Sequence, residues 1–353
     1  MRIIPSLELK ELYYAKKHAW IYALLKVTDT ILIRPEKEVA KAYGYRLSLN
    51  DYLKKFYHID ARFKFIMDHG IFVTPKQFRE FFHLDKTPET VLKVYDVLKV
   101  DYGLAYDIPA RLHLEVALSP AKQKLKRGIH PALRKQVELI SFLKDDKIRA
   151  EEEIRTLSLM AVEETLKNLK TQLEIKHKRG YTFTLIPSVQ GLYKEHAVNC
   201  LKESIDLLLS YDEKDLYLAI GTGGTRLKEE DVKLINDLLV FGHEYAKKHE
   251  VSIKFHLLGF SSAPILKKLR VDLIHSADAV TVLRRAVEKK VYIIRNNDLK
   301  LVPVKDIDKE KWSCTCPACN NFKHLVLQDA STREAHVRFV HNLAILNEYF
   351  KVQ

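Results

Sequence analysis

Short apolar segments that end in a polar residue or a glycine recur along this chain, with helical patterns between them. The apolar run 63–67 ends at Asp68, and the run 104–106 leads in the same way to Asp107. Runs of this kind are typical of strands that are buried on both faces. Further strands are predicted at 182–189, 215–220, 252–258 and 271–275, followed by Gln190, Gly221, Gly259 and Asp278. Helices are predicted over 130–178, 195–210 and 229–249.

This alternation predicts the fold class. Strand, polar end and helix repeat six or more times, which is typical of a parallel α/β protein, and a (β/α)8 barrel of the TIM type fits better than an open sheet. In such a barrel the carboxyl ends of all strands meet at one rim. We therefore predict that residues 1–60 join a barrel over 61–300, with a separate subdomain over 301–353.

The composition indicates a folded protein with a basic surface. Apolar residues make up 47% of the 353 positions, which is enough to bury a large core. The chain has no apolar run of transmembrane length and begins without a signal-peptide pattern, so we expect a soluble, cytoplasmic protein that does not contact membranes. The formal charge of +13 favours a polyanionic partner such as DNA or RNA, although many lysine-rich proteins are basic only for solubility.

Three of the four cysteines, Cys314, Cys316 and Cys319, lie within six positions of one another. Thiolates are soft metal ligands, and a C-x-C-x-x-C run can place three sulfurs at the corners of a tetrahedron. A disulfide cluster is disfavoured because so short a window gives poor disulfide geometry. The fourth cysteine, Cys200, lies beside the apolar face of a predicted helix and is interpreted as a core residue. The spacing therefore predicts a zinc site.

A histidine is expected to supply the fourth ligand. Ser331 to Glu334 is typical of a helix N-terminus, and His341 lies on the helix that follows, among apolar residues at helical spacing. We favour His341 over His324 and His336 because its face of the helix is turned towards the core. Three cysteines and one histidine leave no open coordination position, which predicts structural Zn²⁺ rather than a catalytic metal.

Carboxylates at strand ends are the candidate catalytic groups. Asp68 and Asp107 each follow an apolar run, where an isolated carboxylate is costly. Two carboxylates at one rim suffice for chemistry at an acetal-like carbon, although helix capping or solvation explains any single one equally well. Gln190 offers a donor and an acceptor for the edge of a base, and the glycines within 221–224 let backbone amides approach a ligand.

These residues resemble motifs of the tRNA-guanine transglycosylase superfamily, whose members exchange guanine in nucleic acid for a 7-deazaguanine on a zinc-bearing (β/α)8 barrel. The resemblance covers the chain from about residue 60, and its most specific part is the cysteine cluster followed by His341-Asn342-Leu343. Asp68-His69-Gly70 is similar to an Asp-Ser-Gly turn that carries the family's first catalytic aspartate. The resemblance implies that residues at the strand ends hold the base: Asp107, Gln190, Gly191, Gly221 and Gly259.

The nucleophile is assigned from a second motif. The tRNA enzymes carry Asp-hydrophobic-Phe-Asp, whereas this chain has Asp272-Leu273-Ile274-His275, without the second aspartate. The DNA-acting branch of the superfamily, the DpdA type, has a Val-Asp-Ser-Thr-Ser-Trp-like segment, and the segment 277–284 is similar to it. On that register Asp278 is the nucleophile. Asp272 and an inactive paralogue are the competing interpretations.

The resemblance implies a guanine transglycosylase that acts on DNA. Asp278 would attack C1′ of a flipped deoxyguanosine, and a 7-deazaguanine such as preQ0 would replace the departing guanine. Asp68 would serve as general acid and base, and neither ATP nor a redox cofactor would be needed. The same exchange on tRNA, or a non-catalytic nucleic-acid-binding subunit, are the alternatives. The resemblance is also compatible with a homodimer or with partner proteins.

Overall fold

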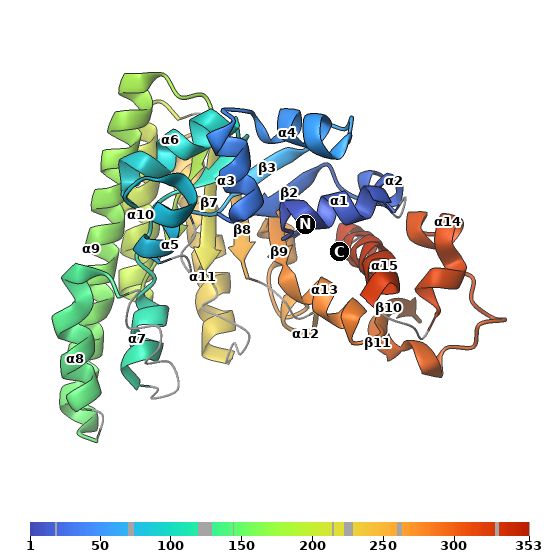
Figure 1. The fold of residues 1–353 in the computed structure, drawn as a ribbon. Helices are drawn as coiled ribbons and strands as arrows, with labels where there is room; N and C mark the ends of the chain where they lie inside the picture. Colours follow the sequence, from blue (N-terminus) through green and yellow to red (C-terminus); the bar gives the residue numbers. More distant parts are fainter. Residues whose placement is uncertain are drawn as a thin grey trace.

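The computed structural model describes residues 1–17, 20–69, 74–118, 129–143, 145–213, 215–221, 229–259, 263–328 and 332–352. Within these residues the chain is a mixed α/β structure with parallel sheets, as the alternating pattern predicts (Figure 1). Helices lie around the sheets, and the carboxyl-terminal part packs beside the first strand (Figure 1).

Nine short strands form two parallel sheets in the described part of the chain. One sheet has the order β1 (Arg2–Pro5), β9 (Ser276–Ala279), β8 (Ile253–Leu258), β7 (Leu216–Gly221) and β6 (Ser188–Val189). The other has the order β2 (Thr30–Ile33), β3 (Lys64–Met67), β4 (Tyr102–Leu104) and β5 (Thr184–Ile186). A separate antiparallel hairpin is made by β10 (Lys290–Arg295) and β11 (Asp298–Pro303). Strands β1 and β2 come from the segment that we expected only to join the barrel.

Two local connections link the edges of the two sheets. Strand β5 runs into β6 across Pro187, whose carbonyl accepts a hydrogen bond from the Ala219 amide at 2.7 Å. At the other side Ser6 forms a parallel bridge with Leu32 and so joins β1 to β2. Where β2 does not reach β1, Asn347 of α15 (Thr332–Val352) bonds to both the amide and the carbonyl of Ile3, at 2.7 and 3.3 Å. The side chain of Asn347 thus takes the place of a neighbouring strand for the backbone of Ile3.

Helices follow most strands and begin at recognisable signals. Pro88 occupies the first turn of α6 (Pro88–Leu98), where the Thr87 side chain caps the Thr90 amide. The long helix α9 (Lys147–Arg179) ends at Gly180, whose φ of 65° closes the helix in the left-handed region. The remaining helices after β3 are α5 (Pro75–Phe82), α7 (Ala110–Leu118), α8 (Arg134–Phe142), α10 (Lys194–Ser210), α11 (Glu229–Lys248), α12 (Ala263–Leu266), α13 (Val280–Val287) and α14 (Pro317–Val326). Those before β3 are α1 (Leu9–Lys17), α2 (Ile21–Leu25), α3 (Lys37–Gly44) and α4 (Leu49–Tyr57).

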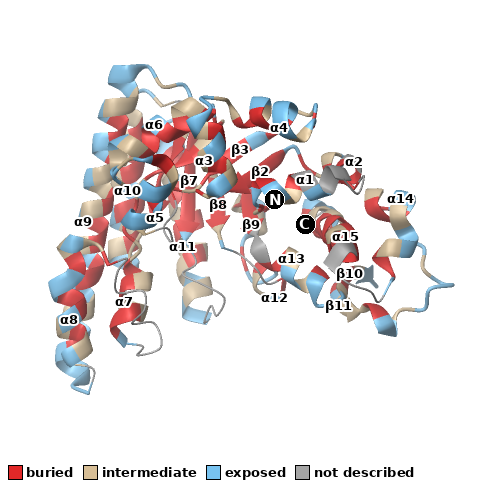
Figure 2. Ribbon diagram, viewed as in Figure 1, coloured by how far each residue is buried: buried red, intermediate tan, exposed pale blue. Residues whose placement is uncertain are grey.

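The two faces of a strand in the parallel sheets contact two different hydrophobic clusters. Alternate residues such as Phe65 and Met67 of β3 belong to the large core beneath the helices, whereas Ile66 between them belongs to a smaller cluster. That smaller cluster, here called the inner cluster, takes residues from both sheets: Ile4, Leu32, Ile66, Leu104, Ile186, Tyr217 and Ala219. Figure 2 shows the strands of the two parallel sheets as mostly buried, as the apolar runs predict.

The prediction of a strand at 271–275 is wrong. Residues Val271–Leu273 form a 3-10 turn, and the strand β9 begins five residues later at Ser276, so that Asp278 lies within it. The apolar residues within 271–275 belong to the loop before β9, in which Asp272 and His275 are exposed. The strand itself begins with the small residues Ser276 and Ala277, which are fully buried. Small residues give no apolar run, although they pack well where strands and helices come close.

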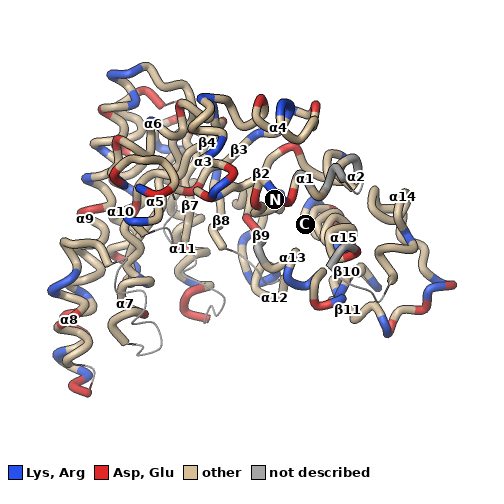
Figure 3. Tube along the Cα trace, viewed as in Figure 1, with Lys and Arg blue, Asp and Glu red and all other residues tan. Residues whose placement is uncertain are grey.

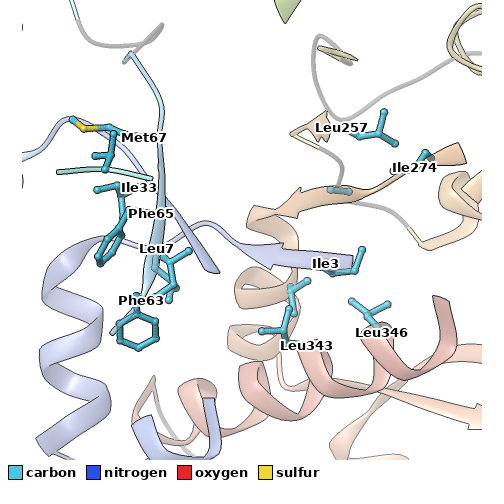
Figure 4. Packing of buried hydrophobic residues seen from close by; sticks show 14 of the residues in the cluster. Ile3, Leu7, Ile33, Phe63, Phe65, Met67, Leu257, Ile274, Leu343 and Leu346 are labelled. Atoms are coloured by element: carbon cyan, nitrogen blue, oxygen red, sulfur yellow. The ribbon is translucent and has the colours of Figure 1, made fainter. Parts of the chain in front are cut away.

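The carboxyl-terminal helix attaches the metal-binding region to the sheets. Leu343 and Leu346 of α15 pack against Ile3 of β1 (Figure 4). The fully buried Arg338 donates from Nε to the Ala286 carbonyl at 2.9 Å and from a terminal nitrogen to the Gln328 carbonyl at 2.8 Å. A buried guanidinium is tolerated here because it satisfies carbonyls at the ends of α13 and α14. The first strand and the last helix are thereby held together.

Candidate functional site

The three clustered cysteines and His341 come together as a candidate metal site. The Nδ1 atom of His341 lies 3.7, 3.3 and 3.4 Å from the sulfurs of Cys314, Cys316 and Cys319. Tetrahedral zinc, with bonds of about 2.3 Å to sulfur and 2.0 Å to nitrogen, requires S···N separations of about 3.5 Å. The four ligand atoms therefore fit a structural zinc ion, and all of them lie within 4.8 Å of one another.

The surroundings of His341 prepare Nδ1 for a metal. His341 is fully buried on α15, and its Nε2 lies 2.9 Å from the Tyr292 carbonyl, to which only an N–H can donate. The proton is thus fixed on Nε2, and the lone pair of Nδ1 faces the sulfurs. The adjacent Asn342 accepts from the Tyr292 amide at 2.8 Å, which anchors α15 to β10. The Cys316 sulfur also accepts from the Cys319 amide at 3.4 Å.

The other two candidate ligands lie elsewhere. His324 is exposed on α14, a helix that the pattern did not predict, and His336 stacks on Trp20 with ring centroids 5.3 Å apart. The prediction of His341 as the fourth member of the cluster is confirmed. Ser331, expected to cap α15, lies outside the described residues.

The predicted site residues lie at the carboxyl ends of the parallel strands. Asp68 follows β3 directly and continues its ladder, because its amide donates to the Ile33 carbonyl of β2 at 2.9 Å. Asp107 comes three residues after β4, and Gln190 follows β6. In β9, Asp278 pairs in register with Ile4 of β1. Asp68, Asp107 and Gln190 thus follow the carboxyl ends of β3, β4 and β6, and Asp278 lies in the carboxyl-terminal half of β9.

Asp107 is the centre of a buried polar group. Its side chain is 5% exposed, and its two oxygens are both engaged by the protein. His69 Nε2 lies 2.6 Å from Oδ1, and the Gln190 amide nitrogen donates to Oδ2. His69 is 4% exposed, and its Nδ1 has no hydrogen-bond partner. Asp107 therefore orients the side chains of His69 and Gln190. The Nδ1 atom of His69 and the amide oxygen of Gln190 do not contact Asp107 and are the atoms with which these side chains could bind a ligand.

A lysine that the sequence did not single out lies beside these carboxylates. Burial lowers the pKa of Lys86 to about 8, while the negative charges of Asp68 and Asp107 act to raise it. Its ammonium group also lies 5.6 Å from the centre of the Tyr106 ring. The Tyr106 ring is 5.2 Å from that of His69, and burial, together with Asp107, raises the pKa of its hydroxyl. Asp68, Asp107 and Lys86 thus form one charged group at the ends of β3 and β4.

Helix α9 fixes the segment that carries Asp107. The buried Thr165 accepts from the Ile108 amide at 2.9 Å, and the buried Gln172 accepts from the Tyr106 amide at 2.7 Å. These residues share the buried face of the helix with Leu169 at helical spacing. Polar residues on an otherwise apolar helical face were the signal that could have identified them.

The glycines have different roles. Gly191 has a φ of 137°, and a Cβ there would lie 2.6 Å from the Ala197 amide nitrogen, so it allows the chain to pass close to α10. Gly259, with a φ of 71°, donates its amide N–H to Asp278 Oδ1 at 2.5 Å. Gly221 is exposed at the end of β7. Gly70 and residues 222–224 lie outside the described residues.

The two candidate nucleophiles have contrasting environments. Asp278 is 3% exposed and points to the side of the sheet that carries the inner cluster, because Ser276 two residues earlier contacts Tyr217. Asp272 is exposed before the amino end of β9 and forms an ion pair with Arg270 at 2.7 Å, which lowers its pKa. Only Asp278 lies at the strand ends that carry Asp68 and Asp107.

No protein-family model matches this chain, and no curated protein matches it. The assignment of function therefore depends on the chain's own residues. Figure 3 shows basic and acidic residues on the same helices in several places, among them α4 and α9. Among the described residues, no helix combines the length and the apolar character needed to cross a membrane.

Proposed function

We propose that this protein is a guanine transglycosylase that exchanges guanine in DNA for a 7-deazaguanine. The observation that carries the proposal is the placement of Asp68 and Asp278. Ile66 of β3 belongs to the inner cluster, and Asp68, two residues further on, shares its face of the strand. Asp278 shares the corresponding face of β9, so both carboxylates are aimed at one space beyond the inner cluster.

The proposal includes closure of the two sheets into a (β/α)8 barrel, with β5 and β6 counted as one strand. The bridge between Ser6 and Leu32 and the continuity of β5 with β6 support closure, as does an inner cluster that draws on both sheets. In the strand order β1 and β2 separate Asp278 from Asp68. In the proposed barrel, three strand spacings of about 4.8 Å then separate the backbones of Asp278 and Asp68. Because both side chains point into the barrel, their carboxyl groups are closer together than their backbones.

In the proposed reaction the ionised Asp278 attacks C1′ of a guanosine that has been flipped out of the stack. The C1′–N9 bond breaks, and guanine leaves with a proton that Asp68 helps to transfer. An incoming 7-deazaguanine then gives up its N9 proton and displaces the aspartyl ester. His69 and Gln190, both held by Asp107, are placed to contact the edge of the base. The metal site, which we propose holds zinc, supports the fold and takes no part in these steps.

The test is base exchange by the purified protein. Radiolabelled guanine and preQ0 are offered separately, each with guanine-containing DNA or with unmodified tRNA, and the nucleosides are analysed after digestion. The proposal predicts incorporation into DNA that depends on Asp278. Incorporation into tRNA alone would shift the proposal to the tRNA enzymes. Binding of either nucleic acid without incorporation would favour a non-catalytic subunit.

A further inference from the structure

A buried chain of polar groups runs across β7, β8 and β9 and ends at Asp278. The Tyr217 hydroxyl lies 2.5 Å from Ser276 Oγ, which lies 2.8 Å from Nδ1 of His256. Among the described residues the Nε2 atom of His256 has no hydrogen-bond partner, and it lies 3.6 Å from Asp278 Oδ1. His256 and Ser276 are completely buried, and Tyr217 belongs to the inner cluster.

The positions of the protons on Tyr217, Ser276 and His256 decide whether His256 turns an N–H group or a lone pair towards Asp278. If Tyr217 donates to Ser276 and Ser276 donates to Nδ1, the imidazole proton lies on Nε2 and faces the carboxylate. If Nδ1 instead donates to Ser276 and the ring is neutral, a lone pair on Nε2 faces the carboxylate. Two lone pairs in so dry a setting repel each other unless Asp278 itself is protonated.

Asp278 needs such a donor. Its carboxyl group is 3% exposed, and within the described part of the chain the Gly259 amide donates to its Oδ1. An ionised carboxylate removed from water is costly unless N–H groups replace the lost hydration. The Nε2 atom of His256, 3.6 Å from Oδ1, is close enough to supply an N–H group to this carboxylate after a small adjustment.

We propose that His256 is a positioning residue, which carries its proton on Nε2 and orients the Asp278 carboxylate for attack. This inference rests on the proposed function for its catalytic part. The pairing of His256 with Asp278 stands on the buried geometry alone.

The proton can be located without any assay of activity. Histidine labelled with ¹⁵N is incorporated into the full chain, and the His256 signals are identified by their loss in His256→Gln. The proposal predicts a protonated Nε2 in the wild type, and a changed Nε2 signal in Asp278→Asn. A neutral ring with its proton on Nδ1, or a His256 spectrum indifferent to Asp278→Asn, would overturn the inference.

The catalytic part is tested by two matched variants. His256→Phe keeps a ring but removes both nitrogens, whereas the amide of His256→Gln can still donate near the position of Nε2. Formation of the covalent adduct at saturating DNA should slow about 100-fold in the phenylalanine variant, the scale of losing one aligned donor. The glutamine variant should recover most of the rate, and the DNA dissociation constant should stay within about twofold in both.

The outcomes separate the two proposals. Equal rates in wild type and folded His256→Phe would overturn the positioning role. A slow step that glutamine does not rescue, with melting temperatures lowered equally in both variants, would reduce His256 to a packing residue. If the wild type forms no adduct with any guanine-containing nucleic acid, the proposed function fails, while the ¹⁵N spectra still decide whether His256 and Asp278 are paired.

Discussion

Replacing Cys316 by serine should release the metal and destabilise the fold. The sulfur of Cys316 is 3.3 Å from His341 Nδ1 and is buried, so a serine would leave a weak, short ligand facing two thiolates. The cluster belongs to the large core that also contains Leu343 of α15, and α15 in turn packs on β1. Loss of the metal should therefore reach beyond the loop that carries the cysteines.

The expected loss in the free energy of unfolding can be estimated from what the loss of a structural metal costs other proteins. Loss of a structural metal is among the few single changes that cost about 4 kcal/mol or more. With an unfolding entropy of about 2.1 cal/mol/K per residue, each kcal/mol corresponds to about 1.3 °C for a chain of 353 residues, so we expect the melting temperature to fall by about 5 °C. The assay is metal content by mass spectrometry together with a thermal melt. Wild-type protein should carry about one zinc per chain, and the variant should carry almost none.

The matched control is Cys200→Ser, a change at the one cysteine outside the cluster. Cys200 is fully buried, its sulfur accepts from the Gln190 amide at 3.3 Å, and burial raises its pKa to about 11, so it is a neutral thiol. A serine can keep that hydrogen bond, and the metal content should stay at one per chain. Full zinc and an unchanged melting temperature in Cys316→Ser would refute the metal assignment.

Four further predictions follow from the site and the fold. Asp68→Asn should still form the covalent adduct but should turn over slowly, as single-turnover and steady-state rates would show. Burial lowers the pKa of Lys86 from its ordinary value of 10.5 to about 8 in the folded protein. Between these two pH values the unfolded chain binds more protons than the folded one, so the free energy of unfolding should rise with pH. Denaturant melts of Lys86→Met should lack this rise. DNA affinity should fall steeply with added salt, and Arg284→Ala with Arg285→Ala should reduce that slope in a filter-binding titration, unless their pairing with Glu288 persists on DNA. Gly191→Ala should lower the melting temperature, because a Cβ at φ 137° meets the backbone of α10.

Much of the fold could be predicted because its strands are apolar on both faces. The run at 63–67 contains β3, and the boundaries of α10 and α11 were predicted to within a residue. Strand β9 was misplaced because Ser276 and Ala277 are small, and burial of small residues leaves no apolar run. The bridge between Ser6 and Leu32 joins residues that are far apart in the sequence, so it leaves no local pattern, and the proposed closure of the two sheets could not be predicted in detail.

The metal cluster could be predicted because three of its ligands are adjacent in sequence. The polar groups around the carboxylates could not, because they come from distant segments. Lys86 lies in an ordinary charged connection, and only the fold brings it to Asp68 and Asp107. His256 interrupts an apolar strand, which is a signal, but its meaning depends on Asp278 in the next strand.

The central claim is that Asp278 becomes covalently attached to the sugar of a guanosine. The most direct measurement is the intact mass of the protein after incubation with a short guanine-containing DNA and denaturation. The wild type should gain the mass of the DNA less one guanine, Asp278→Asn should gain nothing, and Asp272→Asn should behave as the wild type because its carboxylate is exposed beyond the other end of β9. An unmodified wild-type mass, or an adduct that persists in Asp278→Asn, would contradict the account.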